Sequence, residues 1–519
     1  MAMGNFRRRH TNKKDKRRRA SAMAAKVAAE KVVLQSQDGV EWVVSKAAAA
    51  SRYGVTVKAA IMSNLYDDDY VQTRRSCNMG YSLIRLFVES SDLAKVIHCS
   101  DQLASDPGVA AGFVRGLDHA ALFDLVLAAE TLWHRGLLDL TCRTIKDMIG
   151  GKSPNQVRAM FGIRPPQPGP HGKTTPTKLM TPDQKKQVEL EERALKALHA
   201  VRSHECTVYE PKRNYFVHNR LFYLHNFAFF DHDKESELRR GPPLHEVPPP
   251  LRESIVFSSV NFISLKVRES DVGFPIHVFG TLIARDHVDY RCVYLFRREE
   301  DDAQIITSPD DTLTLMDPCR GLVPDDSVYF EFNLKIKCHG GAVKDFSRGV
   351  TEFNSCRLPG VGKQSLTVPL TTYLSRVELL CADVTYPLEA YISINILKGA
   401  CDLTTVAAWN TKNTEDQIIL YDSRAAASNQ TSKTPNSVAL ARRVVAVPLD
   451  EKLVLHLVVL DGDETEDLFL ILGPSQNEHK HVCKIGCSEV QVKVAWTAVP
   501  KKRKTCKKWE TIGNQRLLL

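Results

Sequence analysis

The sequence predicts an α+β protein in which a block with many helices precedes an all-β region. Apolar residues repeat every three or four positions until about residue 200, which is the period of packed helices. After Ser254 the period changes to two, which is typical of strands with one buried face. The sequence PPP at 248–250 lies between the two patterns as a stiff connector. A chain of 519 residues is too long for one core, so we expect about two to four domains.

The composition is that of an ordinary globular protein, with 43% hydrophobic and 25% charged residues. It excludes collagen and a chain that is disordered throughout. No apolar run approaches the ~18 residues that cross a bilayer, and no apolar block follows the basic N-terminus. We therefore expect no membrane partner and no secretory signal. The thirteen cysteines are then expected to be reduced thiols of the cytosol or nucleus.

The positive charge of the chain lies in its two ends. Residues 1–31 carry +9 and residues 500–519 carry +6, whereas the whole chain carries +9. Residues 32–499 therefore carry −6, and a fold of this charge predicts no specific nucleic-acid partner.

Dense basic clusters occur at 13–19 and at 501–504. The second cluster is a close match to a nuclear import signal. Its residues are Lys501, Lys502, Arg503 and Lys504. The clusters predict residence in the nucleus, with the cytoplasm as a second location; the alternative is a pair of solubilising tails.

Changes of composition divide the chain into seven segments. These are a basic tail over 1–30, a first folded domain over 31–163, a linker over 164–180, a helix over 181–200, a second linker and domain entry over 201–250, an all-β domain over 251–499 and a basic tail over 500–519.

The first domain begins with a predicted β-hairpin. Asp38-Gly39 is a turn signal between two β-branched runs, at 32–34 and 42–44. Three short helices are predicted over 117–163. The first helix is expected to have Asp118 as its N-cap and to end at Gly136. The second helix is expected to end at Gly150-Gly151.

The third of these helices and a fourth one after the linker also carry capping signals in the sequence. Ser153 precedes Pro154 and lies three residues before Gln156, which is the pattern of a capping box. Thr181 begins the same pattern in front of a charged helix that we expect to continue to about His199.

The region after residue 250 predicts an antiparallel sandwich or barrel. Apolar residues alternate with polar residues over 328–336, 390–396 and 490–496. Asp461-Gly462 predicts a hairpin turn. Trp409 and Trp496 are expected in the β core.

The first domain resembles the Skp adaptor family of SCF ubiquitin ligases. The segments that carry the resemblance are KVVLQSQDG at 31–39, LFDLVLAA at 122–129, LLDLTCRTIKDMI at 137–149 and GKSPNQVRAMFGI at 151–163. The resemblance implies a BTB/POZ-type α/β fold with C-terminal helices. It also implies a non-catalytic bridge without cofactors, in which one surface holds a cullin and the helices hold the F-box of a substrate receptor.

This resemblance assigns partner-binding roles to particular residues. The F-box-binding residues that it implies are Leu138, Cys142, Ile145, Met148, Ile149, Val157, Met160 and Phe161. The family's cullin-facing Asn-Tyr is replaced by Glu130 and Thr131, so the aromatic anchor is absent. We therefore expect an F-box partner and a weakened cullin contact. The alternative function is an interaction protein that no longer engages a cullin.

The β region resembles a plant domain family of unknown function. The segments that carry this resemblance are VFG at 278–280, RD at 285–286, YLF at 294–296, LTL at 313–315, PCRG at 318–321 and VYFE at 328–331. The resemblance implies a fold class and no chemistry.

The strongest metal candidate is a group of histidines and cysteines near the C-terminus. Its members are His479, His481, Cys483 and Cys487. Their types suit zinc, but their spacing is unlike that of a common zinc finger, so we expect no metal site. The sequence contains neither the nucleophile motif GxSxG nor a phosphate-binding loop, and we expect no catalytic residues.

Overall fold

The computed structural model describes residues 31–63, 67–68, 71–75, 82–164, 181–212, 214–221, 228, 230–238, 240–324, 327–338, 340–354, 365–399, 402–424, 436–461, 464–475 and 478–499. These residues form two compact units. The helical unit comprises the described residues up to Glu205 together with Ala228 and Phe230. The β unit comprises 206–221 and 231–499. The tails at 1–30 and 500–519, with their basic clusters, and residues 165–180 lie outside the described residues.

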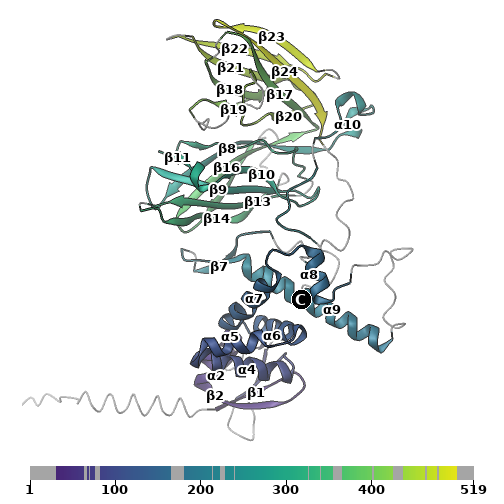
Figure 1. Cartoon of the computed structure of the whole chain (residues 1–519), viewed down its shortest axis with the longest axis vertical. Coiled ribbons are helices and arrows are strands. Elements are labelled where there is room, and N and C mark those ends of the chain that lie inside the picture. Colours follow the sequence, from purple (N-terminus) through teal and green to yellow (C-terminus); the bar gives the residue numbers. More distant parts are fainter. Residues whose placement is uncertain are drawn as a thin grey trace, which may run out of the picture. The chain divides into compact units, whose positions relative to one another are not determined.

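A five-stranded sheet begins the helical unit. Figure 1 labels its strands β1 and β2. Its strand order is β2-β1-β5-β4-β3. The strands are β1 (Lys31–Gln35), β2 (Glu41–Ser45), β3 (Asp67–Asp68), β4 (Val71–Arg75) and β5 (Ser82–Leu86). Strands β1 and β2 form the predicted hairpin, with Val33 opposite Val43, and Gly39 adopts a φ of 88° in the turn. Strand β1 also pairs with β5 in parallel.

Helices form the rest of the helical unit. They are α2 (Lys46–Arg52), α3 (Val55–Ser63), α4 (Ser90–Ser105), α5 (Pro107–Arg115), α6 (His119–Thr131), α7 (Arg135–Ile149), α8 (Pro154–Phe161) and α9 (Pro182–Glu205). The predicted caps are confirmed. Asp118 accepts a hydrogen bond from the Ala121 N–H, Ser153 and Gln156 form a capping box, and Thr181 accepts one from the Gln184 N–H.

Two helix boundaries differ from the prediction. The chain reverses at Trp133, whose φ is 49°, so Gly136 lies inside α7 and does not end α6. Gly136 packs beside Leu103: a Cβ at position 136 would lie 2.9 Å from Leu103 Cδ2, so the leucine side chain would have to shift. Helix α9 ends at Glu205 and not near His199, because its buried stripe continues through Ala200 and Val201.

The β unit contains two sandwiches where the sequence predicted one sandwich or barrel. The first has sheets of order β10-β9-β13-β14, with β11 on β9, and β12-β8-β16-β15. Its strands are β8 (Ser258–Ser270), β9 (Ile276–Arg285), β10 (Val293–Arg298), β11 (Gln304–Ile306), β12 (Thr312–Leu313), β13 (Val328–Lys337), β14 (Val343–Phe353), β15 (Ser365–Thr371) and β16 (Ser375–Thr385). Both sheets contribute to one core, which includes Phe262, Phe330 and Leu379.

The second sandwich has its own core. Its sheets have the orders β20-β17-β24-β23 and β19-β18-β21-β22. The strands are β17 (Pro387–Lys398), β18 (Asp402–Asn410), β19 (Asn413–Asp422), β20 (Val444–Pro448), β21 (Leu453–Asp461), β22 (Glu464–Leu472), β23 (His479–Ile485) and β24 (Ser488–Ala498). Trp496 is 3% exposed in this core, and Trp409 is buried beside Ala407 and Val454. The antiparallel pair β21–β22 confirms the hairpin predicted at Asp461.

Residues 201–250 contain more structure than a linker. After the end of α9, strands β6 (Thr207–Glu210) and β7 (Tyr215–His218) form a hairpin. The short helices η2 (Leu244–Glu246), η3 (Glu300–Asp302) and α10 (Leu251–Ser254) also belong to the β unit.

Among the described residues, no helix has the length and apolar character to cross a membrane.

Candidate functional site

The predicted F-box-binding residues divide into two groups by exposure. Four side chains are buried in the core of the helical unit and are at most 6% exposed; they are Cys142, Ile145, Ile149 and Val157. The other four are half-buried; they are Leu138, Met148, Met160 and Phe161. The buried four therefore stabilise the unit itself, and a partner can reach the half-buried four without unfolding it. We call these four the α7–α8 surface.

Phe161 is the largest side chain of the α7–α8 surface. Its ring makes edge contacts with Phe123, at 5.0 Å between centroids, and with His119, at 5.2 Å. These contacts with α6 fix the orientation of the ring. Val157, one turn before it, is buried in the core and holds α8 against the unit. An aromatic ring that is oriented yet partly exposed suits the role of an anchor for a partner helix.

The predicted cullin-facing pair lies at the C-terminal end of α6. The Thr131 hydroxyl donates a hydrogen bond to the Leu127 carbonyl at 2.8 Å, so its polar group is used within the helix. Glu130 is exposed to solvent. The surrounding protein nevertheless partly desolvates its carboxylate, which raises the pKa of this group. Neither side chain supplies an aromatic contact surface.

Sequence reasoning missed an exposed aromatic residue beside this pair. Trp133 is 67% exposed in the turn between α6 and α7, and its carbonyl accepts a hydrogen bond from Val55, which is 60% exposed. Gly54 permits this close approach, because a Cβ there would lie 2.2 Å from the Leu132 carbonyl oxygen. A tryptophan at the break between two apolar stripes was the available signal.

His134 fixes the turn that presents Trp133. Its Nδ1 accepts the Leu137 N–H at 3.2 Å and caps α7, so the proton of the neutral ring lies on Nε2, 2.7 Å from Ser100 Oγ. Burial lowers the pKa of His134, which keeps the ring neutral in this role.

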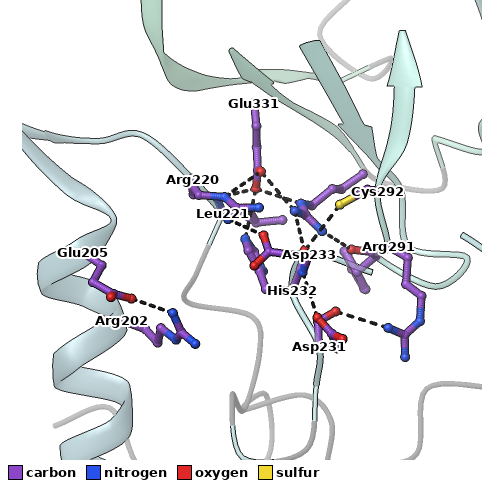
Figure 2. Close-up of polar contacts among 12 residues, drawn as sticks. Arg202, Glu205, Arg220, Leu221, Asp231, His232, Asp233, Arg291, Cys292 and Glu331 are labelled. Atoms are coloured by element: carbon purple, nitrogen blue, oxygen red, sulfur yellow. Dashed lines mark hydrogen bonds and ion pairs between the residues drawn. The ribbon is translucent and has the colours of Figure 1, made fainter. Parts of the chain in front are cut away.

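The β unit holds a buried ionic network, which Figure 2 shows around Glu331. The Glu331 carboxylate on β13 accepts hydrogen bonds from Arg285 Nε at 2.8 Å and Nη2 at 3.0 Å. It also accepts them from Arg220 Nε at 3.1 Å and from the Leu221 N–H at 2.8 Å. The arginines hold the pKa of Glu331 well below its usual range. A carboxylate saturated with donors in this way is not poised to take up a proton in a reaction.

Arg285 also holds the backbone of two loops. Its Nη2 donates to the His232 carbonyl and its Nη1 to the Tyr290 carbonyl, both at 2.9 Å. Arg220 adds an ion pair with Asp233 at 2.7 Å. Residues 220–221 and 232–233 are therefore fastened to the first sandwich by charged hydrogen bonds.

A second buried cluster continues this arrangement. Arg320 is fully buried and donates to Asp286 through two nitrogens, at 2.7 and 2.8 Å, and to Asp289 at 3.1 Å. The Ser236 hydroxyl donates to Asp289 at 2.7 Å, and the Val323 N–H donates to Asp286 at 2.9 Å. The first cluster therefore joins loops to strands β9 and β13, and the second joins loops to one another.

These clusters explain which sequence segments carried the resemblance of the β region. Arg285 and Asp286, Arg320, and Glu331 all lie in those segments. These residues were identified from the sequence as part of the resemblance, but their pairing was not predicted. The signal was present as single charges beside or within apolar strands, which require a partner when buried.

The structure places the four members of the His/Cys group near the C-terminus in different surroundings. His479, His481 and Cys483 lie on the same side of β23, and the two histidine rings stack at 5.9 Å. His479 Nε2 lies 3.1 Å from the Gly473 carbonyl, Cys483 packs against the second core, and Cys487 is exposed beyond the turn. In the described part of the chain, no three His, Cys, Asp or Glu side chains are placed to hold a metal ion together.

Comparisons with known proteins find two families, in separate parts of the chain. The Skp1 family, dimerisation domain, matches residues 135–167, which include α7 and α8. A domain of unknown function (DUF6598) matches residues 259–494, which include most of the two sandwiches. The matches coincide with the two resemblances inferred from the sequence.

Individual relatives agree with the first of these matches. SKP1-like protein 1A of Arabidopsis thaliana is 32% identical over 155 residues, which cover 27% of this chain and 88% of the relative. SKP1-like protein 13 of the same plant is 33% identical, over 25% of this chain and 84% of the relative. SKP1-like protein 1 of Oryza sativa subsp. japonica is 56% identical over 54 residues, which cover 10% of this chain and 31% of the relative.

Comparison with solved structures adds no argument about function. Human GIVD cytosolic phospholipase A2 aligns with 48% of this chain and 31% of its own, at 7% identity and a TM-score of 0.18. A likeness this weak says nothing about fold or chemistry.

Proposed function

Because the chain belongs to the SKP1-like family, whose members are non-catalytic adaptors, we propose that it is an adaptor subunit of an SCF-type ubiquitin ligase. In this function the α7–α8 surface binds the F-box of a substrate receptor. A second surface, at the end of α6, faces a cullin scaffold. The complex would direct protein ubiquitination and proteasomal degradation, and the ligase chemistry would belong to its other subunits.

The observation that carries this proposal is the α7–α8 surface. It lies within the segment that the Skp1 family matches, and it presents four half-buried apolar side chains, one of which is the oriented ring of Phe161. Apolar side chains on adjacent short helices suit the burial of an amphipathic partner helix. The β unit would add a second contact, whose target its sequence does not name.

The alternative is an F-box-binding protein that does not engage a cullin. The replacement of the family's Asn-Tyr by Glu130 and Thr131 favours this alternative, because a threonine cannot replace the contact area of a tyrosine.

Affinity purification of the tagged full-length chain distinguishes these proposals. Recovery of F-box proteins together with a cullin supports the ligase adaptor, and F-box proteins without a cullin support the alternative. Recovery of neither, from cells in which a tagged SKP1-like protein 1A recovers both, would contradict each of them.

We also propose that the basic clusters at 13–19 and 501–504 direct the protein to the nucleus. Deletion of 500–508 combined with neutralisation of 13–19 should move a fluorescent fusion out of the nucleus. An unchanged distribution would mean that the clusters only contribute charge.

A further inference from the structure

The β unit contains a hollow with two arginines in its wall, and neither family match gives it a function. Its volume is about 480 Å³. The residues that line it are Arg240, Asp317, Pro318, Cys319, Arg443 and Val444. Three of them come from the loop between β12 and β13, two from the start of β20, and Arg240 precedes η2. The hollow therefore lies where both sandwiches contribute residues.

Asp317 holds one of these arginines in place. Its carboxylate accepts the Arg443 N–H at 2.8 Å, the Val444 N–H at 3.2 Å and Arg443 Nε at 3.0 Å. Both carboxylate oxygens are thus used to fix the start of β20 and the base of one guanidinium group. The two Nη groups of Arg443 donate to no acceptor among the described residues, so their donors remain for a ligand.

The second guanidinium group converges on the same place. Arg240 lies over the Tyr391 ring, 3.0 Å from its centroid, and the Arg443 guanidinium lies 5.4 Å from the same centroid. Within the described part of the chain, Arg240 makes no ion pair and donates no hydrogen bond. Two positive groups therefore share one ring and one lining carboxylate, which leaves the hollow with a net positive charge.

The carboxyl group of Glu389, which interacts electrostatically with Arg240, is engaged elsewhere. Glu389 is 1% exposed, and it accepts the Gly321 N–H at 2.7 Å and the Thr497 hydroxyl at 3.3 Å. Burial raises the pKa of Glu389 to about 7. Near neutral pH its carboxyl group is thus partly protonated and only partly offsets the charge of Arg240.

We propose that this hollow binds a small organic anion, whose carboxylate or phosphate oxygens accept hydrogen bonds from Arg240 and Arg443. Guanidinium groups bind both kinds of oxyanion through paired N–H donors. Pro318 and Val444 contact the uncharged part of the ligand. The volume is larger than a bare ion needs and lies in the range of small-molecule sites. This binding is independent of the adaptor function.

Matched probes test the proposal on the full-length chain. Phenyl phosphate and benzoate carry the two anionic groups on one ring, and benzyl alcohol is their neutral counterpart. We expect one or both anions to bind in a calorimetric titration, with benzyl alcohol at least tenfold weaker, since it lacks the charge that the arginines recognise. The tighter anion identifies phosphate or carboxylate as the natural group. Equal binding of all three probes, or of none, would overturn the proposal.

Two substitutions locate the site. Arg240→Gln should weaken the preferred anion at least tenfold and leaves the Asp317–Arg443 contact intact, so it is the decisive variant. Arg443→Gln should weaken it as well. Arg252→Gln is the matched control, because Arg252 also lies over a tyrosine ring, Tyr386, at 4.9 Å but does not line the hollow. An unchanged affinity in folded Arg240→Gln would contradict the assignment.

Cys319 provides a readout of position. It lines the hollow and is half-buried, whereas Cys338 has similar exposure and does not line it. The bound anion should slow alkylation of Cys319, measured by mass spectrometry, and leave the rate at Cys338 unchanged. Equal rates at Cys319 with and without a saturating anion would place the ligand elsewhere and overturn the proposal.

Discussion

The helical unit and the β unit differ in whether they bury charged side chains. In the described part of the helical unit, no Asp, Glu, Lys or Arg residue is buried. Among the described residues of the β unit, nine of these charged types are buried: Glu210, Arg285, Asp286, Asp289, Arg320, Glu331, Glu389, Arg442 and Glu451. The ion pairs of the helical unit, such as Arg193 with Asp124, retain contact with solvent.

This difference shows that a residue that makes a family recognisable need not take part in binding or catalysis. In the helical unit, the recognisable segment over α7 and α8 presents a surface to solvent. In the β unit, the recognisable charges pair with each other in the interior and fasten loops to strands. The two resemblances therefore point to different features. In the helical unit the feature is a partner surface, and in the β unit it is an internal network of ion pairs that supports the fold.

The largest expected effect follows from breaking the buried network. Glu331→Ala would leave the Arg285 and Arg220 guanidinium groups without their common carboxylate. We expect a loss of about 3–5 kcal/mol in the unfolding free energy of the β unit. Asp124→Ala, which removes an exposed ion pair from the helical unit, should cost less than ~1 kcal/mol. Denaturant unfolding followed by hydrogen exchange measures each unit separately. Equal losses would refute the contrast between the units.

The next effect is on pH dependence. Burial and the neighbouring Arg285 charge lower the pKa of His232 to about 4, below the ~6.5 of an unfolded chain. The unfolded state therefore binds the proton first, so His232 by itself makes the free energy of unfolding of the β unit fall by about 3 kcal/mol as the pH drops from about 6.5 to 4. Glu389 acts in the opposite sense over this range, because burial raises its pKa to about 7 and the folded state takes up its proton first.

A substitution identifies the group responsible for this slope. The unfolding free energy of the natural chain minus that of His232→Gln isolates this contribution and should fall by about 3 kcal/mol as the pH drops from about 6.5 to 4. Both forms should keep the loss below pH 4, where Glu331 takes up its proton. His134, whose pKa is also lowered, should give the helical unit a slope of the same sign. A difference between the natural chain and His232→Gln that is constant over this range would contradict the assignment.

A smaller effect concerns the cullin-facing surface. Restoring the family's residues through Glu130→Asn and Thr131→Tyr should raise the affinity for the N-terminal domain of a cullin by about thirtyfold, or ~2 kcal/mol. The aromatic ring would supply contact area that threonine lacks. Titration of both forms measures the gain.

Trp133 provides a check on this expectation. If the natural chain already binds the cullin tightly, and Trp133→Ala abolishes that binding, the exposed tryptophan has replaced the missing tyrosine. Tight binding that survives Trp133→Ala would show that the loss of the aromatic anchor has no effect.

Local signals in the sequence predicted much of the helical unit. Asp118, Ser153 and Thr181 cap helices as expected, because a cap depends on residues three positions apart. The hairpin of β1 and β2 depends on one turn, and the alternation in β13 depends on one buried face. Each of these features is specified within about ten residues.

Features that depend on distant residues were not predictable in this way. Glu331 pairs with Arg285 across 46 positions and with Arg220 across 111. No local period reveals such pairs. The division into two sandwiches has the same origin, because alternation defines a strand but not the sheet it joins. Gly136 was misread since its packing against Leu103 is a tertiary contact.

The central claim is that the α7–α8 surface binds an F-box, and titration of the full-length chain with an F-box peptide tests it most directly. We predict saturable one-to-one binding that Phe161→Ala weakens by about thirtyfold or more, because loss of such an anchor costs ~2–4 kcal/mol. Met160→Glu, which does not disturb the Phe161–Phe123 contact, should weaken it too, and Phe469→Ala in the β unit should not. The claim would be contradicted if the natural chain does not bind the peptide. It would also be contradicted if both folded α8 variants bind it as tightly as the natural chain does.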